Sequence, residues 1–306
     1  MCRERGDGFT LISLHMAAHY HHFGKSSHAA KASFKYRPSK VGYSTKTDFA
    51  ASATAPAYTL MSIPFEAVDG KGISLNDLKF SNLAYNSYLP TSCDQIWFWV
   101  KLDNGSWDYE TWRYRTPDAG WVTLSAITKG GVPFAANTSF DTVYPDGIPV
   151  GSAFWFRAYN NAKTRTFTAS GQVLSENVSR TINRGQFQFV GLPYPTNLKL
   201  NGEDKNVDSS NCTYNNYLPT SCDQIWFWVE KSDKTWDYET WRYRTPEAGW
   251  VSVGTITKGG VTYPAGTPFQ TVYPDGVPVA SGFWFNSYNK AGASSTYDLN
   301  FISPIK

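Results

Sequence analysis

The sequence predicts an all-β fold made of two tandem homologous domains, each a β-sandwich or an open barrel. Three observations lead to this prediction. First, Tyr85–Asn161 and Tyr214–Lys290 are identical at 53 of 77 positions, with a constant offset of 129 residues. Second, each copy consists of short apolar and aromatic runs separated by turns rich in Gly and Pro, which is the pattern of consecutive strands. Third, neither copy shows a sustained helical period of apolar residues.

The repeat also predicts the domain organisation. The alignment continues upstream, where Pro64 falls on Pro193, so that each copy starts near Tyr58 or Phe187. A period of this length indicates two domains rather than short solenoid units that depend on their neighbours. We therefore expect a leader at 1–57, a first repeat at 58–178 and a second repeat at 185–306.

The leader differs from the rest of the chain in charge. It contains eight Lys and Arg against three acids, a balance of +5, so the other residues carry −2 of the total of +3. It also contains all five His and no acid between Gly8 and Thr47, which is typical of a targeting or disordered segment. Because the basic charge lies in the leader, we expect no nucleic-acid interface on the repeats. No run of 18 apolar residues occurs, so we expect no transmembrane segment.

Within the repeats, the turns come in the same order in both copies. Lys-Gly-Gly and Tyr-Pro-Asp-Gly turns follow a hairpin that is dense in Trp. Asn104-Gly105 favours a two-residue hairpin loop, which would place residues whose numbers sum to 209 opposite each other. One face then carries Ile96, Phe98 and Trp107 as a core face. The other face, which we call the predicted aromatic face, carries Trp97, Trp99, Glu110, Trp112 and Tyr114, repeated as Trp226, Trp228, Glu239, Trp241 and Tyr243.

The predicted aromatic face suits carbohydrate binding. A sugar ring has an apolar C–H face and a polar rim, so flat indoles can stack on the ring while carboxylates accept hydrogen bonds from its hydroxyls. We therefore hypothesise a non-enzymatic protein that binds a polysaccharide or another glycan through these ten residues. The alternative is a structural or adhesive surface scaffold in which this face is buried, because central strands are commonly apolar on both sides.

Catalysis has less support. Matched carboxylates such as Glu110 and Glu239 leave a glycoside hydrolase open as a third hypothesis, since that chemistry needs two carboxylates facing one cleft. Neither copy contains His, which excludes Ser-His-Asp and Cys-His catalysis within a copy. The sequence contains no CxxC motif, and we expect no cofactor and no metal site. Cys212 and Cys222 are close enough in sequence to form a small disulfide, which would leave Cys93 unpaired.

Two resemblances bear on localisation. The segment Gly8-Phe9-Thr10-Leu11-Ile12 resembles the processing site of type IV prepilins, with Ser13 where that family has Glu. Tyr58–Phe65, Ile148–Phe156 and Val277–Phe285 resemble segments of a group of uncharacterised exported, Trp-rich β-repeat proteins of verrucomicrobial-type bacteria. The second resemblance implies export and β structure, and it transfers no catalytic residue. We therefore expect a secreted or cell-surface protein, although the chain has no clear signal peptide.

Overall fold

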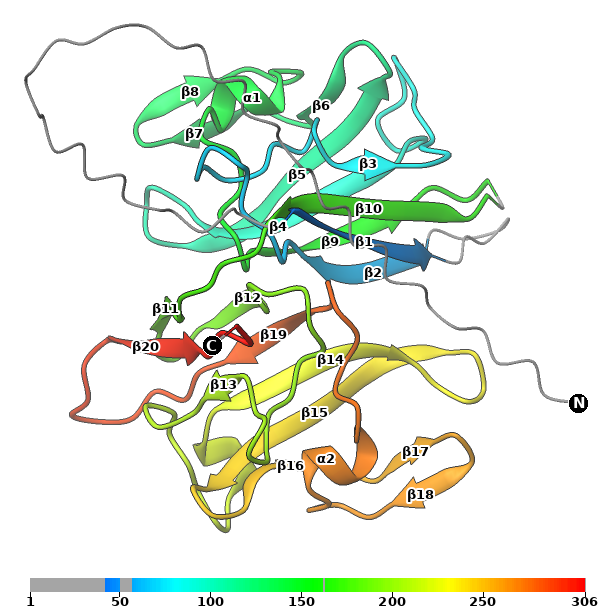
Figure 1. Ribbon diagram of the computed structural model, residues 1–306. Helices are drawn as coiled ribbons and strands as arrows, with labels where there is room; N and C mark the ends of the chain where they lie inside the picture. The colour runs from blue at the N-terminus through cyan, green and yellow to red at the C-terminus, as the bar shows by residue number, and fades with distance from the viewer. Residues whose placement is uncertain (1–41, 50–56, 162, 306) are drawn as a thin grey trace, which may run out of the picture. The chain divides into compact units, whose positions relative to one another are not determined.

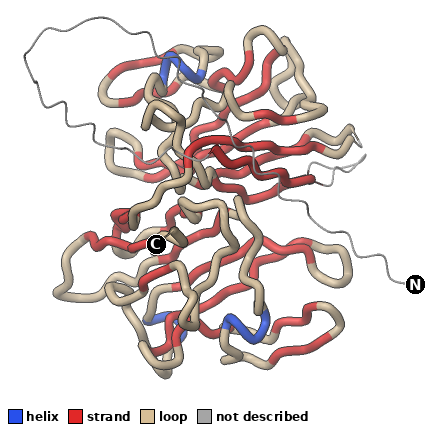
Figure 2. The backbone as a smooth tube through the Cα atoms, in the orientation of Figure 1, coloured by secondary structure: helices blue, strands red, loops and turns tan. Residues whose placement is uncertain are grey.

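The computed structural model describes residues 42–49, 57–161 and 163–305. It confirms the all-β class: almost all regular structure in these residues is antiparallel strand (Figure 2). The exceptions are two single-turn helices, α1 (Phe140–Val143) and α2 (Phe269–Val272), and a 3-10 turn, η1 (Pro219–Ser221). The prepilin-like segment and the leader's histidines lie outside the described residues.

The first repeat is built around a five-stranded sheet in the order β2-β9-β4-β5-β6 (Figure 1). Its strands are β2 (Ala57–Ser62), β4 (Gln95–Lys101), β5 (Trp107–Thr116), β6 (Gly120–Thr123) and β9 (Ala153–Ala158). A three-stranded sheet in the order β1-β10-β3 combines β1 (Gly42–Phe49), β3 (Lys79–Phe80) and β10 (Arg165–Gln172). A separate hairpin joins β7 (Ile127–Lys129) to β8 (Val132–Phe134). Strand β1 comes from the segment that the sequence assigns to the leader.

The second repeat has the same arrangement of sheets. Its five-stranded sheet, in the order β12-β19-β14-β15-β16, contains β12 (Phe187–Gly191), β14 (Gln224–Glu230), β15 (Trp236–Thr245), β16 (Gly249–Ser252) and β19 (Gly282–Asn286). Its three-stranded sheet, in the order β11-β20-β13, contains β11 (Val178–Asn183), β13 (Val207–Asp208) and β20 (Thr296–Phe301). The hairpin is formed by β17 (Ile256–Lys258) and β18 (Val261–Tyr263).

Each repeat has its own hydrophobic core between its larger and smaller sheets. In the first repeat, alternate residues of the five-stranded sheet, including Ile96 and Phe154, pack with Phe167 of β10 and Phe140 of α1. The second core is built from the equivalent elements: Ile225 and Phe283 of the five-stranded sheet pack with Leu299 of β20 and Phe269 of α2. Strands supply these side chains because successive residues point to opposite faces of a sheet.

The register of the Trp-rich hairpin differs by one residue from the prediction. Residues whose numbers sum to 208 lie opposite each other, as in the pair Ile96 and Trp112. The cause is a three-residue loop: Leu102 N donates to Ser106 O at 2.8 Å, and Gly105 adopts a φ of +84°. This is the turn with a left-handed third residue that is common in three-residue hairpins.

A shift of one residue exchanges the faces of the whole second strand. Trp112, Glu110 and Tyr114 therefore lie on the core side, with Ile96 and Phe98. Trp107 and Tyr109 lie instead beside Trp97 and Trp99 on the outer side. The same correction applies to the second repeat, where Trp241, Glu239 and Tyr243 lie on the same side of the sheet as Ile225 and Phe227.

The second hairpin makes the same turn without Gly, which yields a testable prediction. Lys234 adopts a φ of +69° at the position equivalent to Gly105, and a residue with a Cβ is disfavoured there. We expect Lys234→Gly to raise the free energy of unfolding by about 0.5–1 kcal/mol. Urea unfolding followed by Trp fluorescence measures this change.

Lys234→Ala is the matched control, because it removes the same exposed side chain but keeps the Cβ. It also removes the exposed 3.7 Å ion pair to Glu230, so both variants lose that contact equally. Equal stability of the Gly and Ala variants would show that the backbone conformation is not the cause.

The two five-stranded sheets pack against each other through their outer faces, within one compact unit of the chain. Equivalent atoms make reciprocal hydrogen bonds across this contact: Ser62 N donates to Ala280 O at 2.8 Å, and Gly191 N donates to Gly151 O at 2.9 Å. A Cβ added to Gly191 would lie 2.1 Å from the Cβ of Ser62, its own equivalent in the first repeat. Contact between equivalent positions is the mark of a two-fold interface.

Candidate functional site

Four of the predicted site residues lie between the two repeats. The outward-facing indoles of β4 and β14 are half-buried, where they pack with the hydrophobic cluster that joins the two sheets. Trp99 meets Trp284 of the second repeat with ring centroids 5.6 Å apart, and Trp228 meets Trp155 of the first repeat at the same separation. These two edge-to-face contacts are equivalents of each other, so both repeats contribute the same surface. The other two predicted indoles at this contact are Trp97 and Trp226.

Hydrogen bonds hold three of the four indoles at this contact, whereas Trp228 Nε1 has no hydrogen-bond partner among the described residues. Trp97 Nε1 donates to Gln95 Oε1 at 2.9 Å, and Trp226 Nε1 makes the equivalent bond to Gln224 Oε1. Trp99 Nε1 donates across the interface to the carbonyl of Phe187, also at 2.9 Å. The outer face of each large sheet is therefore partly covered by the other repeat.

The remaining predicted residues lie on the core side of the sheets. Trp112 and Trp241 are fully buried against Phe140 and Phe269, the aromatic residues that begin α1 and α2. Tyr114 and Tyr243 pack on the indoles of the next strand. Glu110 and Glu239 also point to this side. The ten predicted residues thus form no single surface, because the register divides them between two faces.

A cleft of about 420 Å³, lined by the second repeat and at one edge by Thr59 and Leu60 of β2, combines some of these residues with others that the sequence did not single out. Trp228 and Glu239 line it as predicted site residues. Trp236, Lys258 and Tyr273 also line it. Trp236 is 42% exposed, and its ring lies nearly parallel to that of Trp228, with centroids 6.3 Å apart. The cleft therefore has one aromatic wall that is open to solvent.

The polar wall of the cleft is a cluster of Glu239, Tyr273 and Lys258. The hydroxyl of Tyr273 donates to Glu239 Oε2 at 2.5 Å, and Lys258 Nζ lies 3.2 Å from the centroid of the Tyr273 ring. Burial raises the pKa of Tyr273, as does the adjacent carboxylate, so the hydroxyl stays protonated and donates at neutral pH. Burial also lowers the pKa of Lys258, an effect that the charge of Glu239 opposes.

The first repeat contains the same polar cluster. Tyr144 OH donates to Glu110 Oε1 at 2.7 Å, and Lys129 Nζ lies 2.9 Å from the Tyr144 centroid. Here Trp112 Nε1 also donates to Glu110 Oε1, at 2.9 Å. The equivalent indole nitrogen, on Trp241, has no hydrogen-bond partner in the described part of the chain, so the carboxylate of Glu239 accepts fewer hydrogen bonds there than that of Glu110.

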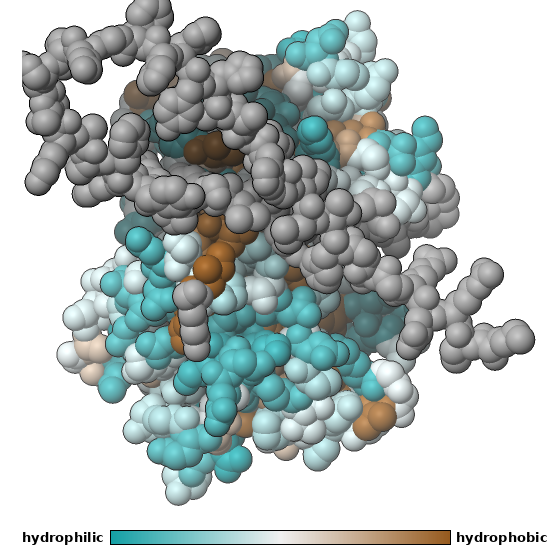
Figure 3. Space-filling model, in the orientation of Figure 1, coloured by the Kyte–Doolittle hydropathy of each residue, from teal (hydrophilic) through white to brown (hydrophobic). Residues whose placement is uncertain are grey.

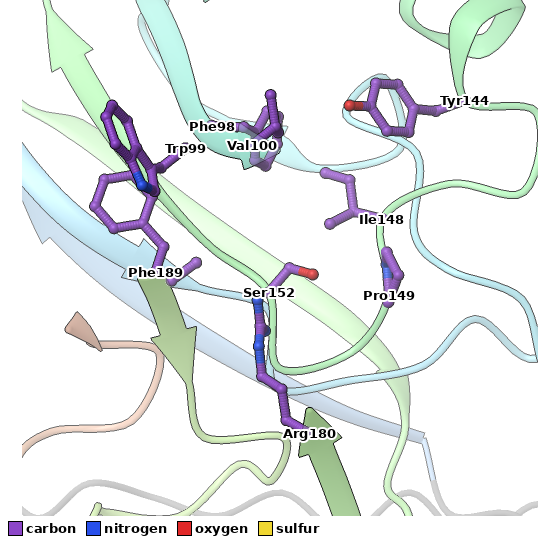
Figure 4. Close-up of a pocket in the computed structure, with 10 residues that line it drawn as sticks. Phe98, Trp99, Val100, Tyr144, Ile148, Pro149, Ser152, Arg180 and Phe189 are labelled. Carbon is purple, nitrogen blue, oxygen red and sulfur yellow. The ribbon is translucent and has the colours of Figure 1, made fainter. Parts of the chain in front are cut away.

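The cavity at the equivalent place in the first repeat is smaller and has a different charge. It measures about 140 Å³ and is lined by Phe98, Trp99 and Tyr144, among others. Arg180 of β11 reaches into it, as Figure 4 shows. The two cavities therefore occupy matching places in the fold but differ in size and in polar lining.

Tyr88 and Tyr217 are the most exposed aromatic rings that the structure describes, at 90% and 84%. They lie on equivalent loops before β4 and β14, where Asn86 and Asn215 accept backbone hydrogen bonds that hold each loop. Neither ring lines the cleft of the second repeat. Figure 3 shows that the visible surface of the second repeat is mainly hydrophilic, with apolar residues in small separate patches.

The described part of the chain contains no assembled thiol or metal site. Cys93, Cys212 and Cys222 are buried free thiols, so the disulfide considered between Cys212 and Cys222 is not formed. Burial raises the pKa of Cys93 and that of Cys222 to about 11. Among the described residues, no group of three or more His, Cys, Asp and Glu is placed to hold a metal ion, and no helix is long and apolar enough to span a membrane.

The sequence contained signals for the residues that the prediction missed. Lys129 and Lys258 belong to the repeated Lys-Gly-Gly turn, and Tyr144 and Tyr273 open the repeated Tyr-Pro-Asp-Gly turn. Trp236 is the equivalent of Trp107, which the predicted register placed on the core face.

Searches for a match to this chain among protein-family models, curated proteins and solved structures returned none.

Proposed function

We propose that this protein is a non-enzymatic glycan-binding protein whose binding site is the cleft of the second repeat. The observation that carries the proposal is the position of Trp236, an open indole beside a polar cluster within a cleft of about 420 Å³. Ligand sites in proteins are commonly concave and apolar, with a few convergent polar groups and volumes of roughly 300–1,000 Å³. The cleft has each of these properties.

The chemistry of the lining favours a sugar over a purely apolar ligand. The indole of Trp236 offers a flat surface for the C–H face of a pyranose. Lys258 offers hydrogen-bond donors, and Glu239 offers acceptor sites beyond the one that Tyr273 uses. The same cleft therefore presents both kinds of group that a sugar requires, at its stacking face and at its rim.

The arrangement suits binding better than hydrolysis. A glycosidase needs two carboxylates that act on one bond, and Glu239 already accepts a hydrogen bond from Tyr273. Glu230 also lines the cleft, but it pairs with Lys234, and the first repeat has Lys101 in its place. We therefore retain the non-enzymatic assignment as part of the proposal.

A structural role for the remaining aromatic residues is the second candidate function. It rests on the reciprocal contacts of Trp99 with Trp284 and of Trp228 with Trp155. In this proposal the paired indoles hold the two repeats together as a rigid scaffold. A secreted or cell-surface location remains part of both candidates, supported by the resemblance of Tyr58–Phe65 to exported proteins.

Glycan binding predicts that Trp236→Ala weakens binding to any oligosaccharide that the wild-type protein selects from a glycan array. We expect a loss of about 5- to 150-fold in affinity, because stacking on one aromatic ring contributes roughly 1–3 kcal/mol in comparable flat-ligand sites. Isothermal titration calorimetry with the selected oligosaccharide measures the loss.

Trp107→Ala is the matched control, since Trp107 is the equivalent residue in the first repeat and does not line the cleft. Its affinity is expected to equal that of the wild type. A blank array for the wild-type protein would contradict the proposal, as would full binding by the Trp236 variant.

A further inference from the structure

Arg180 is a charged side chain with little local compensation. It projects from β11 between two adjacent cavities of about 140 and 270 Å³, both of which it lines. Its Nη1 donates to the carbonyl of Gly151 at 2.8 Å, which is its one hydrogen bond among the described residues. No Asp or Glu lines either cavity.

The surroundings of the guanidinium are largely apolar. Figure 4 shows Arg180 extending toward Ser152 and Phe189, with Trp99 beside Phe189 and with Ile148 and Pro149 on the other side of the cavity. Burial in this environment lowers the pKa of Arg180 to about 10, so the group remains charged at neutral pH. A partly buried charge without a counterion costs free energy that a bound anion can offset.

Two hydroxyl groups also line the cavity that Arg180 enters. The hydroxyl of Ser152 has no hydrogen-bond partner among the described residues, and it lines both cavities. Tyr144 presents its hydroxyl from the opposite wall, where it is bonded to Glu110. Arg presents several N–H donors in a planar fork that matches a carboxylate or a sulfate.

We propose that the first-repeat cavity, which β11 and β12 of the second repeat close with Arg180 and Phe189, is a subsite for an anionic group on a saccharide, a carboxylate or a sulfate ester, with Arg180 as its charged anchor. This inference rests on the proposed glycan-binding function and specifies the class of glycan as acidic. The cavity of about 140 Å³ admits an acidic substituent and part of its ring, whereas the larger cleft of the second repeat accommodates a longer stretch of chain.

The charged residues that line the two cavities differ, and this difference supports the assignment of the acidic group to the cavity of Arg180. The cleft of the second repeat is lined by Glu230 and Glu239 together with Lys231, Lys234 and Lys258, and no Arg lines it. The two carboxylates offset two of the three ammonium charges there, so the cleft keeps a formal charge of +1. Arg180 is the one charged residue that lines the first-repeat cavity, and no carboxylate lines that cavity with it. The two equivalent sites therefore differ in the presence of acidic groups, not in the sign of their net charge.

The test compares acidic and neutral oligosaccharides on the full chain. The probes are an oligogalacturonide, a sulfated galactan oligosaccharide and their neutral galactose counterpart, titrated by calorimetry at low and moderate salt. Arg180→Gln removes the charge but keeps a donor for the Gly151 carbonyl, and Arg180→Lys keeps the charge but loses the fork. Arg244→Gln is the control for net charge, because Arg244 lies on β15 and donates to Asn216 Oδ1.

We expect the wild-type protein to prefer one acidic probe over the neutral one. Arg180→Gln should bind that probe at least about tenfold more weakly, Arg180→Lys should show a smaller loss, and Arg244→Gln should show none. Whether the uronate or the sulfated probe responds identifies the anionic group. Thermal unfolding of each variant reports whether the fold is retained.

The outcomes separate this inference from the proposed function. If Arg180→Gln binds acidic probes as the wild type does while Trp236→Ala does not, the anionic subsite is overturned and the glycan cleft stands. If acidic probes bind through Arg180 while Trp236→Ala has no effect, the subsite stands and the cleft of the second repeat is overturned. If the wild type binds neutral and acidic probes equally, the inference fails. If it binds neither, both proposals fail.

Discussion

Replacing Arg165 by Leu is expected to lower the free energy of unfolding by about 3–5 kcal/mol at neutral pH. Arg165 and Asp94 are both fully buried, and they form a two-pronged pair: Nη2 donates to Oδ1 at 2.8 Å, and Nε donates to Oδ2 at 3.0 Å. Removing the guanidinium leaves a carboxylate buried without its counterion, which is the most costly way to break such a pair. Urea unfolding monitored by Trp fluorescence measures the change.

The second repeat supplies the matched control. Asp223, the equivalent of Asp94, is also fully buried, but a neutral hydroxyl from Tyr297 takes the place of the guanidinium. Tyr297→Phe removes one hydrogen bond to this carboxyl and is expected to cost about 1–3 kcal/mol. Equal losses in the Arg165 and Tyr297 variants would contradict the special cost of the unpaired charge.

The Tyr297 variant also yields a pH prediction. Burial raises the pKa of Asp223, and the hydrogen bond from Tyr297 opposes this effect. A carboxyl whose pKa is raised on folding contributes stability below its unfolded pKa, and this contribution is lost as the pH rises through the folded value. Tyr297→Phe removes a donor that favours the charged carboxylate. We therefore expect the deficit of Tyr297→Phe to shrink as the pH falls from about 7 to about 4, and a constant deficit would argue against this explanation.

Trp284→Ala is expected to have a comparably large effect, about 3–5 kcal/mol, through the interface between the repeats. Trp284 is 8% exposed, and its ring contacts Phe189 at 4.0 Å and Trp99 at 5.6 Å between centroids. Its Nε1 donates to the hydroxyl of Tyr238 at 3.0 Å. The substitution therefore removes packing within the second repeat and contact with the first. Chemical unfolding gives the total loss.

Calorimetry distinguishes loss of the interface from general destabilisation. If the indole couples the two repeats, we expect the variant to unfold in two separable transitions, because uncoupled domains no longer melt together. Trp155→Ala, at the equivalent position, should behave in the same way. Trp236→Ala is the control, since an exposed indole contributes within about 0.5 kcal/mol away from special contacts. A single unshifted transition in the Trp284 variant would contradict the interface role.

The strand content of this protein follows from local patterns in its sequence. The turn motifs and the short aromatic runs predict β structure because they act over a few residues. The side chains that face inward at β4, such as Ile96 and Phe98, were correctly placed on the core face, since alternation along one strand depends only on that strand.

The prediction of which side chains of β5 face the core was wrong, because the register between β4 and β5 depends on the geometry of one turn. Asn104-Gly105 suits both a two-residue loop and the three-residue loop that is formed, and the choice moves Trp112 and Glu110 from one side of the sheet to the other. The same error hid Trp236, which lies on the open wall of the cleft.

The candidate site depends on contacts that are distant in sequence. Tyr273 reaches Glu239 across 34 residues, and Arg180 reaches Gly151 across 29 residues. These contacts can be recognised only in the folded chain. The residues next to Arg180 in the sequence, for example, do not show that no Asp or Glu lines its cavities. The repeated turns marked Lys258 and Tyr273 as matched positions but gave no reason to place them beside an indole.

The all-β class, the internal duplication and the inward alternation of β4 can be derived from the sequence, because these properties depend on neighbouring residues and on direct comparison of the two copies. Which indoles are covered depends on how the folded repeats pack. The outer faces of the two large sheets lie against each other, so Trp99 and Trp228 pack between the repeats while Trp236 stays open. Burial of a sheet face depends on what packs against it, and for both large sheets the packing partner belongs to the other copy.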